Sequence, residues 1–147
     1  MVRSQRMEPI KNLADGRERE AGAQVAAARK AVEDAERQLA QLRAYREDYA
    51  QRLAGGAAPA ATLLQNYHAF LGRLSAAIEQ QAKVVEGARG HLASVTDEWR
   101  ERRVDAASIG RAVEKIAAGE RRVAEARSQR EDDERAMRRS TAERDAG

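Results

Sequence analysis

Apolar residues recur every three or four positions along most of the chain, the pattern of a helix with one face turned toward a partner. In the second half the repeat runs without a break from Leu64 to Met137. An earlier stripe, from Ala21 to Leu53, is apolar at all its positions but Arg46. The two stripes therefore predict two long helices that pack against each other.

One strong break separates the stripes, at Gly55–Pro59. Glycine weakens a helix, and proline starts a helix well but disfavours helical geometry in the residue before it. With Pro9 as the other start, we predict helices over about 9–53 and 60–140, a loop at 54–59, and ends outside the helices. The sequence thus predicts an all-α fold, with a single domain over 1–147 and two long helices in an antiparallel coiled-coil hairpin.

The short loop also predicts a C-terminal helical overhang. If Tyr49 faces Tyr67 across the seam, Ile10 faces roughly Ala106, and about 35 residues of the second helix remain unpaired, a length of roughly 50 Å. This part still carries Ile109, Val113 and Ile116 on one face. An apolar stripe without an intrachain partner predicts an external one.

Charge divides the chain at the same place. The 46 residues from Ala54 to Trp99 hold seven charges, whereas the 48 residues from Arg100 to Gly147 hold 24. Tyr45 and Phe70 flank the seam of the nearly neutral hairpin tip, where coiled coils usually carry charges. They predict a docking patch, although both rings could instead fold over the seam and widen a core made thin by alanine.

The sequence offers no arrangement that favours catalysis, so we predict a protein that is not an enzyme and needs no cofactor or metal. There is no cysteine, and His68 and His91 lie too far apart on one helix to share a metal. The interspersed charges, with a net charge of +3, indicate a solvated surface rather than a nucleic-acid interface. No apolar run is long enough to span a membrane and no signal peptide is evident, which predicts a cytoplasmic protein.

Several segments resemble the flagellar export protein FliJ family. They are the opening Ser4–Ala14, the stretches Gln38–Tyr49, Asn66–Leu74 and Ser75–Gln81, the isolated Trp99, and the ending Gln129–Glu134, where Arg130 replaces the family's lysine. The resemblance spans almost the whole chain, and the order and spacing of its segments are more specific than any one of them.

The resemblance implies a non-enzymatic stalk of the bacterial flagellar type III export apparatus, similar to the central shaft of rotary ATPases. It implies binding of the hairpin tip to the export gate, a membrane protein, by a patch of eight residues: Gln38, Leu42, Tyr45, Tyr49, Phe70, Leu74, Ala77 and Gln81. It also implies entry of the terminal half into the ring of the export ATPase hexamer. For that contact the overhang offers Ile109, Val113, Ile116, Arg121, Arg122, Arg127 and Arg130. Export chaperones are further partners, and the location is peripheral, at the inner-membrane base of the flagellum.

Two alternatives fit the same physics. One is the equivalent stalk of a virulence type III secretion injectisome. The other, from a different class, is a self-assembling coiled-coil scaffold or a protein lying on a membrane surface. The neutral tip patch favours a stalk over a scaffold, and the lack of a one-sided basic lipid face weighs against the membrane surface.

Overall fold

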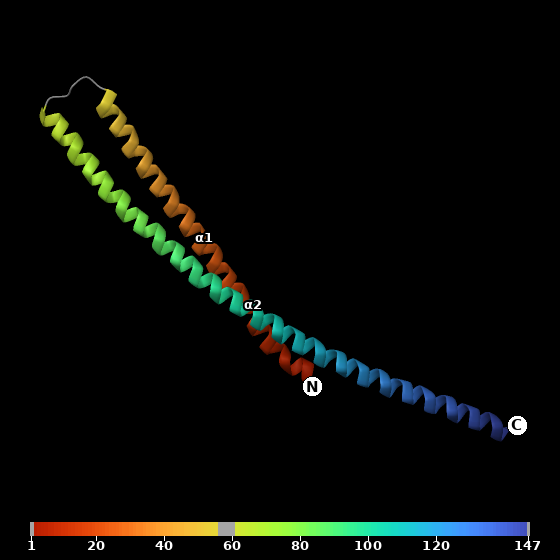
Figure 1. Ribbon diagram of the computed structural model, residues 1–147. Coiled ribbons are helices and arrows are strands. Elements are labelled where there is room, and N and C mark those ends of the chain that lie inside the picture. The colour runs from red at the N-terminus through yellow and green to blue at the C-terminus, as the bar shows by residue number, and fades with distance from the viewer. Residues whose placement is uncertain (1, 56–60, 147) are drawn as a thin grey trace. The chain divides into compact units, whose positions relative to one another are not determined.

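The computed structural model describes residues 2–55 and 61–146 and consists of two long helices (Figure 1). They are α1 (Arg3–Gly55) and α2 (Ala61–Ala146), and no strand occurs in this part of the chain. The prediction of an all-α fold with two long helices packed against each other is confirmed. Of the loop predicted at 54–59, residues 54 and 55 belong to α1 and the rest lies outside the described residues.

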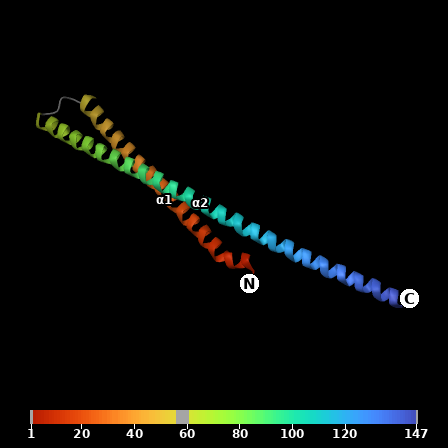
Figure 2. The same ribbon diagram turned by 60° about the horizontal axis from the view of Figure 1, so that its bottom comes forward.

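The chain divides into two compact units. The hairpin unit comprises Arg19–Glu101, and the terminal unit pairs the chain up to Glu18 with the chain from Arg102 onward. In the hairpin unit, the orange-to-yellow part of α1 lies antiparallel beside the green part of α2 (Figures 1 and 2). Both helices therefore contribute to each unit.

The core of the hairpin unit is a narrow seam of small apolar residues. On α1, alanine recurs every seventh residue and a larger residue follows four positions later: Ala21, Val25, Ala28, Val32, Ala35 and Leu39 are all buried. α2 contributes Leu74, Val85 and Val95, with Trp99 packed against the cluster around Val95. The regular heptad spacing explains why α1 keeps one face on α2 over many turns.

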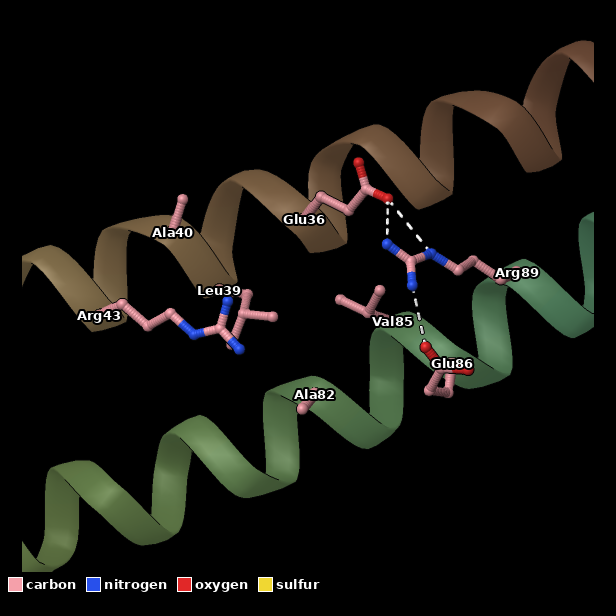
Figure 3. A pocket seen from close by; sticks show the side chains of 8 residues that line it. All are labelled: Glu36, Leu39, Ala40, Arg43, Ala82, Val85, Glu86 and Arg89. Atoms are coloured by element: carbon pink, nitrogen blue, oxygen red, sulfur yellow. Dashed lines mark hydrogen bonds and ion pairs between the residues drawn. The ribbon is translucent and has the colours of Figure 1, made fainter.

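Polar side chains bridge the two helices at the edges of this seam. Arg89 donates from Nη2 to Glu36 across the seam at 2.8 Å, and from Nη1 to Glu86 on its own helix at 2.9 Å (Figure 3). Gln81 donates to the backbone oxygen of Ala35 at 3.1 Å. The ion pairs are exposed, so each contributes only about 0–1 kcal/mol, and they help fix the register more than they stabilise the fold.

The terminal unit has a smaller core and two hydrogen bonds between Ser4 and Glu120, which we call the clasp. Ala14 of α1 and Val113 of α2 are buried, and Ile109 and Ile116 are half-buried. The Glu120 carboxylate accepts the Ser4 backbone N–H at 3.0 Å and the Ser4 hydroxyl at 2.5 Å. The first turn of α1 has no acidic residue of its own, so Glu120 acts as a capping group supplied by the other helix.

The structure corrects the predicted helix ends. α1 begins at Arg3, before the proline that was expected to start it, and Pro9 lies inside the helix. A proline near the N-terminus removes few helical hydrogen bonds, and the packing of this segment on α2 offsets its cost. At the other end, α2 continues to Ala146, six residues beyond the predicted 140, through a stretch rich in alanine, arginine and glutamate.

The longer α1 also corrects the predicted overhang. The stripe of Ile109, Val113 and Ile116 is not unpaired, because the first turns of α1 cover it and Val113 is buried. Every residue from 121 to 146 is exposed, so the true overhang follows Glu120 and measures roughly 40 Å. It appears as the blue end of α2 (Figure 1).

The buried seam predicts a sharp contrast between two neighbouring valines of α2. Val85 is 3% exposed and Val84 is 46% exposed. We expect Val85→Ala to lower the free energy of unfolding by about 2 kcal/mol, because it leaves a cavity in the seam, and Val84→Ala to change it by less than about 0.5 kcal/mol. Chemical unfolding followed by circular dichroism measures both, and equal effects would contradict the assigned seam.

The clasp predicts a pH dependence. Hydrogen bonds from Ser4 hold the pKa of Glu120 below its ordinary value, so the contact stabilises the start of α1 fully above roughly pH 5 and is lost as the pH falls through the lowered pKa. We expect Glu120→Gln to speed amide hydrogen exchange at Arg3–Arg6 at pH 7, with the difference from wild type vanishing at acid pH. Glu125→Gln, at an exposed position, is the control. Exchange unchanged by Glu120→Gln at pH 7 would rule out the clasp.

Candidate functional site

An aromatic cluster occupies the tip of the hairpin unit. The chain has five aromatic residues, and four of them gather here, two from each helix: Tyr45, Tyr49, Tyr67 and Phe70. The two on α1 lie four residues apart and the two on α2 lie three apart, so each pair shares one helix face. The last turns of α1 and the first turns of α2 thus place all four rings together.

Tyr49 is the centre of this cluster. Its ring centroid lies 4.7 Å from that of Phe70, 5.1 Å from that of Tyr45 and 6.4 Å from that of Tyr67. Tyr45 also meets Phe70 edge-on at 6.5 Å. Tilted and edge-on pairs at these distances contribute about 0.5–1.5 kcal/mol each, so the cluster is a cohesive surface rather than four separate rings.

The rings divide between covering the seam and facing solvent. Tyr49, Tyr67 and Phe70 are half-buried, whereas Tyr45 is 51% exposed. The rings thus differ in their position relative to the seam, and docking at Tyr45 stays a prediction. Phe70 covers the seam beside Tyr49, and Tyr45 adds apolar surface outside it.

The structure brings the predicted patch residues together on the two helices of the hairpin unit, with different exposures. Leu74 is buried in the seam, Leu42 is half-buried, and Gln38 and Ala77 are exposed. Gln81 donates a hydrogen bond from Nε2 to Oε1 of Gln38 at 3.2 Å, so these two amide side chains form a polar edge of the patch. Leu74 therefore belongs to the buried seam, whereas Tyr45 is the accessible ring of the patch.

Few charges act on the aromatic cluster. The Arg52 guanidinium lies 5.6 Å from the centroid of the Tyr49 ring and pairs with Asp48 at 3.1 Å. The hydrogen bond between the side chains of Tyr45 and Tyr49 is the main cause that raises the pKa of Tyr49. The Coulomb interaction with Tyr45 raises this pKa further. The Tyr49 hydroxyl thus remains neutral at neutral pH, and the surface combines apolar rings with hydroxyl groups, as protein interfaces often do.

Sequence reasoning left two contributors out of the patch. Tyr67 belongs to the cluster through its contact with Tyr49, and its spacing of three from Phe70 was the available signal. Leu63, 49% exposed, adds apolar surface at the start of α2. It lies beside the predicted stripe rather than on it, so periodicity gave no signal for it.

The second candidate surface is the overhang with the adjoining end of α1. The predicted arginines Arg121, Arg122, Arg127 and Arg130 are all exposed. Arg121 pairs with Glu114 at 2.9 Å. Ile109, Val113 and Ile116 instead lie at least partly beneath α1, so a partner would reach the four arginines first.

An open hollow of about 610 Å³ lies between the N-terminal end of α1 and α2. Its lining combines apolar and charged residues: Val2, Arg3, Ile116, Gly119, Glu120, Val123, Ala124 and Arg127. Val123 is 61% exposed, and Ile116 remains accessible here despite its partial burial. The start of α1 and the first turns of the overhang thus line an open hollow of mixed apolar and charged side chains that includes Arg127.

The described residues offer neither a metal site nor a membrane span. No group of three or more histidine or acidic side chains is placed to hold a metal ion in 2–55 and 61–146. Over the same residues, neither helix has a stretch apolar enough to cross a bilayer.

Comparison with known proteins identifies one family. The family described as Flagellar FliJ protein matches residues 3–145, nearly the whole chain. Comparisons with curated proteins and with solved structures gave no match.

Proposed function

Because the chain belongs to the flagellar FliJ protein family, we propose that it is the non-enzymatic stalk of the flagellar type III export apparatus. In this role it couples the export ATPase ring to the export gate and supports flagellum assembly, motility and chemotaxis. The observation that carries the proposal is the neutral aromatic cluster at the tip, on a chain otherwise rich in charge.

The tip is the proposed contact with the cytoplasmic part of the export gate. Its apolar surface is accessible at Tyr45 and Leu63. Interfaces draw most of their binding energy from a few aromatic anchors in a setting that excludes water. Tyr45 and Phe70 fit that role because they stand at the edge of the seam.

The overhang is the proposed contact with the export ATPase hexamer. It presents the four predicted arginines together with the hollow around Val123. Binding there leaves the pairing of α1 and α2 intact, which suits a stalk held inside a ring. The protein would then work in the cytoplasm, at the inner-membrane base of the flagellum and attached through its partners, with export chaperones as further ligands.

The family match favours the flagellar system over an injectisome. A self-assembling scaffold would need apolar surface along the overhang, yet 121–146 carries only Val123 and Met137 as large exposed apolar residues. The stalk is therefore the better reading of the charge and apolar distribution.

Tyr45→Ala should weaken binding to the purified cytoplasmic domain of the export gate by roughly 5- to 150-fold, which corresponds to about 1–3 kcal/mol. Phe70→Ala should do the same with a larger loss of stability, because Phe70 also covers the seam. Titration calorimetry gives the affinity, and thermal unfolding gives the stability of the same variants.

Two controls make this result interpretable. Leu74→Ala should destabilise the hairpin by about 2–5 kcal/mol, and Lys83→Ala, at an exposed position away from the rings, should change neither quantity. Unchanged gate affinity of Tyr45→Ala, with a large fall in melting temperature, would refute the tip contact.

Ending the chain after Glu120 should abolish stimulation of ATP hydrolysis by the export ATPase and leave the terminal unit folded, because Ser4 and Val113 keep their contacts. Single-site replacement of Arg127 and Arg130 by glutamate should lower the stimulation in part. A truncated chain that stimulates hydrolysis as well as the full chain would exclude the overhang as the ATPase contact.

A further inference from the structure

An open hollow of about 310 Å³ lies between α1 and α2 within the hairpin unit, and none of the four rings of the tip lines it (Figure 3). Leu39 and Val85 of the buried seam form its floor. Ala40 and Ala82 line it from the two helices. Long side chains usually flank the seam of a coiled coil, so the two short alanines leave apolar surface open here.

The carboxylates of the hollow gather at one end. Arg89 donates from Nη2 to Glu36 on α1 at 2.8 Å and from Nη1 to Glu86 on its own helix at 2.9 Å (Figure 3). Two carboxylates thus share a single guanidinium group. This end of the hollow therefore carries one negative charge in excess.

Arg43 provides the positive charge at the other end. It is exposed, and its side chain points along α1 toward Leu39 (Figure 3). Among residues 2–55 and 61–146 it forms no ion pair, and Glu47, one turn further on, instead accepts a hydrogen bond from Gln51 at 3.3 Å. The hollow therefore has a positive end, an apolar floor and a negative end.

This arrangement suits a helix lying in the groove between α1 and α2. The backbone groups of both helices are hydrogen-bonded within each helix, so the hollow offers none to an extended strand. Glu36 and Arg43 lie seven residues apart, about 10 Å along the axis of α1. Two turns of a partner helix cover the same distance, and side chains seven residues apart on it point the same way.

We propose that this hollow docks a helix of another protein that carries a carboxylate and a basic side chain seven residues apart, with a side chain of the size of leucine between them. The carboxylate pairs with Arg43, and the basic side chain pairs with Glu36 and Glu86. The apolar side chain covers Ala40 and Ala82. The interaction uses neither the aromatic tip nor the overhang, so it adds a third binding surface.

Other occupants fit the hollow less well. In a second copy, the segment Glu36–Arg43 has an acid and a base at its ends, but Ala40 between them is too short to fill the space. The overhang of a second copy offers Glu120, Val123 and Arg127 at the right spacing, but the clasp already holds Glu120. An anionic membrane is disfavoured because as many carboxylates as guanidinium groups line the hollow.

A photo-crosslinking amino acid in place of Ala40, in the full chain produced in flagellated cells, tests the proposal. We expect an adduct that mass spectrometry maps to a helical segment of another protein, with a carboxylate and a basic residue seven positions apart and an apolar residue between them. The same crosslinker at Gln41, which is exposed but does not line the hollow, should give less than a tenth of that adduct.

Two substitutions separate filling of the hollow from loss of its charge. Ala82→Leu fills the hollow and leaves every charge in place, and it should reduce the Ala40 adduct at least tenfold. Arg43→Glu should reduce it to the same extent, and replacing the mapped carboxylate by arginine should restore it. Tyr45→Ala alters the tip alone and should leave the adduct unchanged, so the result is independent of the proposed gate contact.

Four outcomes would overturn the proposal. They are an adduct only with a second copy or with lipid, an adduct that persists in Ala82→Leu or Arg43→Glu, an adduct that Tyr45→Ala removes, and no adduct at all. Circular dichroism of each variant checks that the helices remain intact.

Discussion

The narrow seam between α1 and α2 limits what every other part of the chain can do. Alanine recurs at every seventh position of the α1 seam and lets the helices pair, but alanine buries little apolar area. Among residues 2–55 and 61–146, no large side chain is fully enclosed. A seam of this kind holds a long helical pair together without enclosing large side chains. The contacts that we propose with partners therefore lie on exposed faces of the two helices.

The larger side chains and the charges are distributed accordingly. The tyrosines and the phenylalanine meet at the hairpin tip, where they both cover the end of the seam and present apolar area. The overhang carries both arginines and carboxylates, and pairs of opposite charge four residues apart, such as Glu134 and Arg138, support its helix without a partner. Each surface has its own chemistry, which is the basis on which we propose a different partner for each.

The sequence predicted the features that depend on periodicity and composition. Heptad spacing gave the two helices, and the meeting of Tyr45 with Phe70 followed from the short connection and the register near the tip. The burial of Val113 did not follow, because it depends on how far α1 extends before Pro9. Local rules place a helix start at a proline, whereas here a tertiary contact, the hydrogen bonds between Ser4 and Glu120, supports two further turns. No periodic signal marks a single carboxylate that caps another helix.

Amide hydrogen exchange of the full chain, measured alone, with the cytoplasmic domain of the export gate, and with the export ATPase, tests the central claim most directly. The account predicts that the gate domain slows exchange around Tyr45–Tyr49 and Tyr67–Phe70 only, and that the ATPase slows exchange in 121–146 only. Protection by the gate domain in the overhang, or by the ATPase at the aromatic tip, would contradict the assignment of these two surfaces to their two partners.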